Sequence, residues 1–585
     1  MASAVATSPG AGVGDPGLKR EVGFIGLMWA SEGSIIGSGW LFGALFATQL
    51  AGPAAILAWV VGAVACMLLA LVHAELGGLF PVAGGTARFP HYAYGSLVGY
   101  TVGWMSWLQA AAVAPIEVEA AIQYGSSYLH WLTKVELAGT TSVTVLSVPG
   151  GYIVAVVLMA LFCGINLWGI RRLAQINNYA TWWKVAVPVL AIVVLFIARF
   201  HGANFGSAVA ANPAGASGFM PFGPKGVLEA VAAGGVVFAL LGFEQAVQLG
   251  AESANPQRDI PRAVIGAMII GTIIYLLLQV VFIGALQPHD LAKGWGLLSF
   301  GAIAGPYAGL ATGVGLGWLT VILYIDALIS PAGTGLLYVT ATSRLSYGLS
   351  RNGYIPTIFE KLGATSGVPW FSILFAFIAG LFFFLPFPGW QQLVGFITSA
   401  SVLMYAGAPL AFGALRLQLP DHHRPFRLPG GSIISPLSFI VANFIIYWSG
   451  WNVDWKLFLA IIIGFLVLAG EMMFGNNPNK PKLDWRSAVW LWPYLIGMAI
   501  ISYLGQFGQL AVVPKFIFGI PQIPFWWDLV VVAIFSLVIY YWAVSLRLPV
   551  EKVKEYIAGV TYDPQTAGSG PPPTHPHVQE PGFSS

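Results

Sequence analysis

The feature that most constrains this chain is a polar, glycine-rich interruption inside its first long apolar segment. Residues 32–40 place a carboxylate, two hydroxyls and three glycines in a stretch that is otherwise apolar enough to cross a bilayer as one helix. Glycine weakens a helix and lets the backbone leave it. Unpaired backbone groups are tolerated at membrane depth only inside protein or beside a cavity. The segment therefore predicts a broken membrane helix with a binding site at the break.

The composition places the chain among polytopic membrane proteins. Hydrophobic residues make up 57% of its 585 residues and charged residues only 8%, whereas a soluble domain is about one quarter charged. The net charge of +3 is too small to indicate a nucleic-acid partner. Cys66 and Cys163 lie in apolar segments and predict neither a disulfide framework nor a metal site. No cofactor is expected, and residues 1–18 lack the features of a cleavable signal peptide.

Hydropathy predicts fourteen apolar spans, and the charge bias of the connecting segments supports that number. With the N-terminus in the cytoplasm, nineteen basic residues fall on the cytoplasmic side and six on the other, as the positive-inside rule requires. Both termini are then cytoplasmic, and a bacterial plasma membrane is the simplest location. Whether the eleventh and twelfth spans are separate stays open, because residues 451–455 form a very short link. The expected spans are 24–50, 53–80, 99–129, 151–169, 179–199, 227–248, 263–286, 311–341, 369–386, 391–415, 433–450, 456–473, 487–505 and 526–546.

A second glycine-rich interruption lies five spans after the first, at residues 234–244. Interrupted spans at matching places in two halves are typical of an inverted repeat, so an all-α fold with a 5+5 repeat and broken first and sixth helices is expected. The alternative is that these glycines only permit close helix packing. The expected parts are an N-terminal tail (1–20), a transport core of ten spans (21–420), four peripheral spans (421–547) and a disordered C-terminal tail (548–585).

Five stretches, in this order along the chain, resemble signatures of the amino acid–polyamine–organocation permeases. They are the first-helix break (33–40), the second-helix exit (75–85), the broken sixth helix (238–244), the loop after it (252–263) and the exit from the eighth helix (343–356). The resemblance covers roughly residues 20–420. It implies a LeuT-type fold and secondary transport of an amino acid or related amine. The family usually has twelve spans, and some bacterial branches carry two more.

The resemblance assigns substrate binding to the backbone of the two breaks. Free N–H groups and the half-helix dipole at the first break favour the substrate carboxylate, while carbonyl groups freed at the second break would meet its ammonium group. Trp40 and Phe243 adjoin the breaks and are candidate gate residues. The substrate-binding candidates are Ile36, Gly37, Ser38, Gly39, Glu117, Phe238, Ala239, Leu241 and Phe243.

Lys184 stands inside the fifth span, where a lysine costs about 3 kcal/mol by membrane-insertion scales. The resemblance supplies a reason, because proton-coupled relatives carry a lysine where sodium-coupled relatives bind their ion. Snorkelling to an interface or a structural ion pair is the alternative. Asp326, Ser330 and Thr334 share one stripe of the eighth span. Hydroxyls on this helix line the ion site in the family, so the resemblance makes either hydroxyl a candidate acceptor for the ammonium group, with Asp326 a candidate counter-ion. Glu244 is a further candidate for proton coupling.

Five carboxylates lie within the apparent interior, against one lysine. Glu117 and Glu119 are two residues apart and point to nearly opposite helix faces, so at most one meets the substrate. The other acidic residues are Glu32, Glu244 and Asp326. This excess leans towards a cationic amino acid or amine. The resemblance leans the other way, because some fourteen-span branches of the family handle acidic amino acids, so the substrate side chain stays open. Near the cytoplasmic ends of spans, Glu75 and Arg88 are candidates for closing ion pairs.

These features predict a proton-coupled amino acid symporter whose other partners are the lipid bilayer and protons. Exchange of amino acids or polyamines, and nutrient sensing without transport, remain alternatives. A membrane enzyme is disfavoured because no nucleophile–base pair or metal cluster is apparent. A nucleotide-driven pump is disfavoured because the phosphate-loop motif is missing from the sequence. The oligomeric state stays open.

Overall fold

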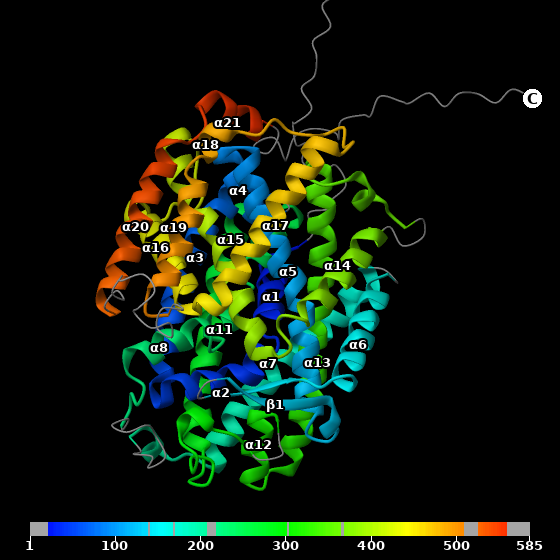
Figure 1. The fold of residues 1–585 in the computed structure, drawn as a ribbon, viewed down its shortest axis with the longest axis vertical. Coiled ribbons are helices and arrows are strands. Elements are labelled where there is room, and N and C mark those ends of the chain that lie inside the picture. Colours follow the sequence, from blue (N-terminus) through cyan, green and yellow to red (C-terminus); the bar gives the residue numbers. More distant parts are fainter. Residues whose placement is uncertain are drawn as a thin grey trace, which may run out of the picture.

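The computed structural model describes residues 22–82, 84–138, 141–167, 170–206, 218–300, 304–363, 368–507 and 525–558. The predicted N-terminal tail, and all of the predicted C-terminal tail beyond residue 558, lie outside these ranges. The prediction of disorder from residue 548 is wrong for its first part, because Val550–Ile557 form a helix that buries Val553 and Ile557. The described chain forms a bundle of helices in which α1, α5 and α15 lie centrally (Figure 1).

The helices of the first half are α1 (Phe24–Ile35), α2 (Gly39–Ala51), α3 (Ala55–Leu79), α4 (Gly85–Tyr94), α5 (Ser96–Gly125), α6 (Gly150–Leu167) and α7 (Ile170–Ala198). Those of the second half are α8 (Gly223–Ala232), α9 (Val236–Leu240), α10 (Gln245–Gln248), α11 (Pro256–Ala285), α12 (Pro306–Gly313), α13 (Gly317–Arg351), α14 (Trp370–Phe383) and α15 (Trp390–Gln418). The remaining helices are α16 (Gly431–Ser449), α17 (Trp451–Phe474), α18 (Trp485–Ala488), α19 (Leu491–Leu504), α20 (Phe525–Ser545) and α21 (Val550–Ile557).

The all-α polytopic architecture is confirmed. Ten helices of the described ranges are long and apolar enough to cross a membrane. The eleventh and twelfth spans are separate, because Gly450, with a φ of 82°, turns the chain between α16 and α17. Helix α13 continues to Arg351, beyond the predicted end, because its last turns are polar and fall outside the apolar pattern while remaining helical.

One short sheet was not predicted. Strands β1 (Thr133–Ala138) and β2 (Thr141–Leu146) pair antiparallel, with Thr133 opposite Leu146, in the segment between α5 and α6. The backbone N–H of Leu146 also donates to the carbonyl of Pro388, just before α15. The hairpin therefore ties this segment to the start of a central helix.

Both predicted helix breaks are present. Helix α1 ends at Ile35 and α2 begins at Gly39, and the sixth span is divided into α8, α9 and α10. Gly235 and Gly242 take φ values of 84° and 122°, a region that favours glycine over other residues. The glycines therefore do more than permit packing, since the chain leaves the helix at both places.

A buried ion-pair network lies at the end of the bundle where α4, α18 and α21 are found. Glu75, at the end of α3, is 1% exposed. It pairs with Arg416 at 2.7 Å and with Arg424 at 3.2 Å, and it accepts the backbone N–H of Leu428 at 2.7 Å. The ion pair expected at Glu75 therefore exists, but its partners come from the far end of α15 and the segment after it, not from Arg88.

We expect Glu75→Ala to lower the stability of the purified protein by about 3 kcal/mol, because the substitution leaves two arginines without their buried partner. Thermal unfolding in detergent measures the loss. Glu136→Ala is the control, because it breaks an exposed pair with Lys134 and should change stability by less than about 1 kcal/mol. Equal melting temperatures for Glu75→Ala and the wild type would contradict the assignment.

Candidate functional site

The two broken segments touch each other in the middle of the bundle. A Cβ atom added to Gly39 would lie 2.9 Å from the Cα of Ala239, and one added to Gly242 would lie 2.8 Å from the backbone nitrogen of Ile35. Both distances are shorter than real side chains tolerate, so only glycine permits this approach. The sequence thus uses glycine at both breaks to bring two unwound segments into contact.

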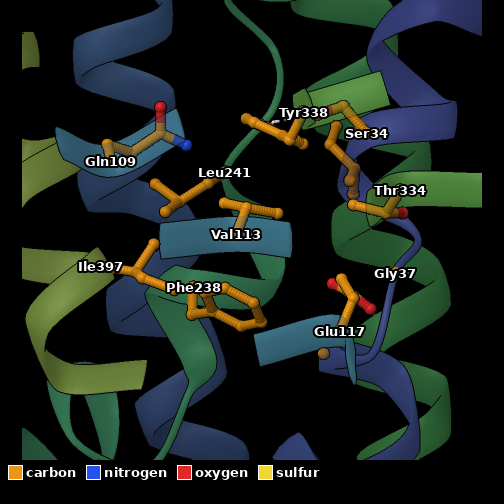
Figure 2. A pocket seen from close by; sticks show the side chains of 12 residues that line it. Ser34, Gly37, Gln109, Val113, Glu117, Phe238, Leu241, Thr334, Tyr338 and Ile397 are labelled. Atoms are coloured by element: carbon orange, nitrogen blue, oxygen red, sulfur yellow. Dashed lines mark hydrogen bonds between the residues drawn. The ribbon is translucent and has the colours of Figure 1, made fainter. Parts of the chain in front are cut away.

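A cavity lies beside this contact (Figure 2). Six of the residues singled out in the sequence line it, whereas Ile36, Ser38, Ala239 and Phe243 are absent from its lining. Ala239 still contacts Gly39, and Ser38 contacts a lining residue, as described below. The six lining residues that were predicted are Gly37, Gly39, Glu117, Phe238, Leu241 and Thr334.

Glu117 of α5 occupies the start of α2. One carboxylate oxygen accepts the backbone N–H of Ser38 at 2.9 Å, and the other lies 3.3 Å from the same nitrogen. The hydroxyl of Ser38 accepts a second bond, from the indole of Trp390 in α15, at 2.8 Å. A helix N-terminus attracts a negative charge, so the N–H predicted to hold a substrate carboxylate is held here by a carboxylate of the protein itself.

Lys184 of α7 is fully buried and bridges two helices. Its ammonium group donates to the carbonyl oxygen of Gly33, in the last turn of α1, and to Oγ1 of Thr334 in α13, both at 2.6 Å. A buried ammonium group is tolerated only with such partners. Of the two candidate hydroxyls on α13, Thr334 is therefore the acceptor, and it also faces the cavity.

Asp326 and Ser330 form a separate cluster one to two turns away on α13. Ser330 donates to Asp326 at 2.7 Å, and the indole of Trp40 donates to the other oxygen of Asp326 at 3.1 Å. Lys184 and Asp326 form no ion pair within 4.0 Å among the described residues. The structure thus shows Asp326 as a direct partner of Ser330 and Trp40, while its charge acts on Lys184 without a direct ion pair. The bond to Asp326 engages the indole N–H of Trp40.

Glu244 lies at the second break, outside the cavity lining. Its carboxylate accepts the backbone N–H of Gly242 at 3.0 Å and the hydroxyl of Tyr405. Phe243 is fully buried against His73 and Tyr405, so the aromatic residue that faces the cavity at this break is Phe238. The carbonyl of Phe238 accepts the N–H of Leu241 at 3.2 Å, which engages one of the predicted ammonium acceptors.

The two remaining interior carboxylates point away from the cavity. Glu119 and Glu32 are 2% and 1% exposed, and neither has a hydrogen-bond partner for its carboxylate among the described residues. Of the pair on α5, Glu117 faces the site and Glu119 does not, as their spacing predicted. Four of the five interior carboxylates are therefore absent from the cavity lining.

Sequence reasoning missed several lining residues, including Ser34, Gln109, Val113 and Tyr338. Their spacing carried a signal. Gln109 and Val113 precede Glu117 by eight and four residues on α5, and Tyr338 follows Thr334 by four on α13. Residues at such intervals share one face of a helix, so extending the stripes of the residues already singled out would have found them.

Comparison with known proteins gives the family. A family model described as amino acid permease matches residues 22–468. The chain is similar to the glutamate/serine transporter AimA of Bacillus subtilis (38% identity, covering 92% of this chain and 96% of the relative). It is also similar to the aspartate-proton symporter of the same organism (37% identity, 91% and 97%) and to its branched-chain amino acid permease BcaP (26% identity, 78% and 93%). The chain is thus a multi-pass membrane protein that belongs to the amino acid permease family, within the amino acid–polyamine–organocation superfamily.

Proposed function

We propose that this protein is a proton-driven amino acid symporter of a bacterial plasma membrane, with both termini in the cytoplasm. The bond of Lys184 to the end of α1 is the observation that carries the coupling. The protonated side chain of Lys184 binds the freed carbonyl of Gly33 with a positively charged group that carries three donors. A neutral amine has only two donors and no charge. Loss of a proton would weaken the tie between α7, α1 and α13, so proton occupancy and helix position are linked.

Glu117 supplies the second part of the proposal. The substrate carboxylate and the Glu117 carboxylate would compete for the N–H of Ser38, since both are anions at one helix N-terminus. Protonation of Glu117 weakens its hold, because a neutral acid is a poorer acceptor than a carboxylate. A proton on Glu117 would then favour substrate binding, which is the direction that symport needs.

The substrate proposed is a short polar or acidic amino acid. The two relatives with 37–38% identity are named for glutamate, serine and aspartate, which supports this class. The lean of the sequence towards a cationic substrate rested on five interior carboxylates, and only Glu117 lines the cavity. The excess of negative charge thus lies mostly outside the site, and it gives no reason to expect a cation.

Uptake into proteoliposomes tests the coupling residue. We expect Lys184→Ala to reduce proton-driven uptake of labelled aspartate and serine at least about tenfold, because the substitution leaves a buried carbonyl unpaired and removes the proton site. Lys293→Ala, at an exposed lysine, is the control and should transport normally. Uptake in Lys184→Ala with an unchanged response to external pH would remove this lysine from the mechanism.

Glu117→Gln separates binding from coupling. The glutamine amide keeps an oxygen that accepts the N–H of Ser38, but it does not gain or lose a proton near neutral pH. We expect exchange of labelled against unlabelled substrate to continue in this variant, while accumulation driven by a proton gradient falls at least about tenfold. Accumulation equal to that of the wild type would show that Glu117 does not carry the coupled proton.

The contact between the breaks can be tested with one methyl group. Gly39→Ala would force its Cβ against the backbone of Ala239, at a cost of about 1–3 kcal/mol. We expect this variant to insert and purify normally but to lose most of its uptake, because the two unwound segments are pushed apart. Gly164→Ala in α6, where an added Cβ meets nothing within 4 Å, is the matched control and should retain full uptake.

A further inference from the structure

The cavity has a second polar end, away from the start of α2. Gln109 of α5, Tyr338 of α13 and Ser34 of α1 meet there and line the cavity. The hydroxyl of Tyr338 lies 2.8 Å from Oγ of Ser34. Gln109 is only 3% exposed. Figure 2 shows it at the opposite end of the cavity from Glu117, with its side chain directed towards Tyr338.

Apart from the hydroxyl of Thr334, the lining between these two ends is apolar. Val113 and Leu241 lie between Gln109 and Glu117, and Ile397 lines the same cavity beside Phe238 (Figure 2). A substrate whose α-carboxylate lies at Ser38 would extend its side chain along this wall and end at Gln109. That end holds an amide and two hydroxyls, and Glu117 is the one charged side chain among the described lining residues. The chemistry of the amide therefore decides which side chain is accepted.

A primary amide offers a donor and an acceptor side by side. A protonated carboxyl group offers the complementary pair, so the two groups can form two parallel hydrogen bonds. A carboxamide matches the amide in the same way. An apolar side chain of equal shape would leave the buried amide unpaired, which costs binding free energy, and a cationic one would find no counter-charge at this end.

We propose that Gln109 is the specificity-determining residue and that it pairs edge to edge with the protonated side-chain carboxyl of a short acidic amino acid. The carboxamide of asparagine is the neutral analogue that the same geometry accepts. This inference rests on the proposed function, because it takes the substrate backbone to lie at the first break.

Aspartate, asparagine and leucine form a natural test set, because their side chains have nearly the same shape and differ in polar atoms. Half-saturating concentrations are measured for each in proteoliposomes with an inward proton gradient. For the wild type we expect aspartate and asparagine to be taken up and leucine to be at least about tenfold weaker. If none of the three, nor arginine, alanine or glutamate, is taken up, the proposed function fails. If leucine or arginine is preferred, transport stands and this inference fails.

Two variants of Gln109 should change the ratios of the half-saturating concentrations differently. In Gln109→Leu we expect both aspartate and asparagine to weaken at least about tenfold relative to leucine. In Gln109→Glu we expect aspartate and asparagine to stay at least about tenfold stronger than leucine, because a carboxyl group at this position still offers hydrogen-bond partners to a polar side chain. A general loss of folding cannot produce a change in these ratios. Gln123→Leu is the matched control, since Gln123 is buried on the same helix but does not line the cavity. Ratios that match the wild type in both Gln109 variants would overturn the assignment.

The protonation state of the bound aspartate side chain can be tested by a separate measurement. Above the ordinary pKa of an aspartate side chain, its protonated fraction rises about tenfold for each unit that the pH falls. Asparagine shares the proton coupling of the transporter but has no such group. The half-saturating concentration of aspartate, divided by that of asparagine, should therefore fall about tenfold per unit as external pH is lowered. A ratio that does not change with pH would exclude the protonated carboxyl as the bound form.

Discussion

Backbone groups that leave a helix inside a membrane need partners, and this need organises the centre of the molecule. Water would satisfy them in a soluble protein, but here side chains of other helices must do so. Lys184 binds the carbonyl of Gly33, Glu117 binds the N–H of Ser38, and Glu244 binds the N–H of Gly242. The hydroxyls of Tyr275 and Ser31 bind the carbonyls of Ile35 and Phe243. The breaks thus determine where the polar residues of α5, α7 and α11 have to lie.

These partners differ in whether they can gain or lose a proton. Tyr275 and Ser31 are neutral donors whose bonds do not depend on proton concentration near neutral pH. Lys184, Glu117 and Glu244 are ionisable, so their bonds to the backbone change strength with each proton gained or lost. Under the proposed function, the ionisable groups at three of these five positions would make the ends of the broken helices responsive to protons.

The sequence revealed those features that carry an energetic cost inside an apolar segment. Glycine-rich breaks and a buried lysine are expensive in a membrane and stand out for that reason, and both were predicted. The acceptor of Lys184 could not be chosen, because Ser330 and Thr334 lie one turn of about 5.4 Å apart on one stripe and the depth of α13 depends on packing. Counting carboxylates did not locate them, since burial does not say which cavity a side chain faces. Gln109 and Tyr338 escaped notice because an amide and a phenol cost less in a membrane than a charge does.

Ser38 makes two contacts, one whose strength does not depend on protonation and one whose strength does. Its hydroxyl is tied to Trp390 in α15, a helix buried along nearly all its length, and an indole neither gains nor loses a proton in the physiological range. Its N–H is tied to Glu117 in α5, where charge decides the strength of the bond. Replacement of Glu117 by a substrate carboxylate would therefore release α2 from α5 while leaving it attached to α15.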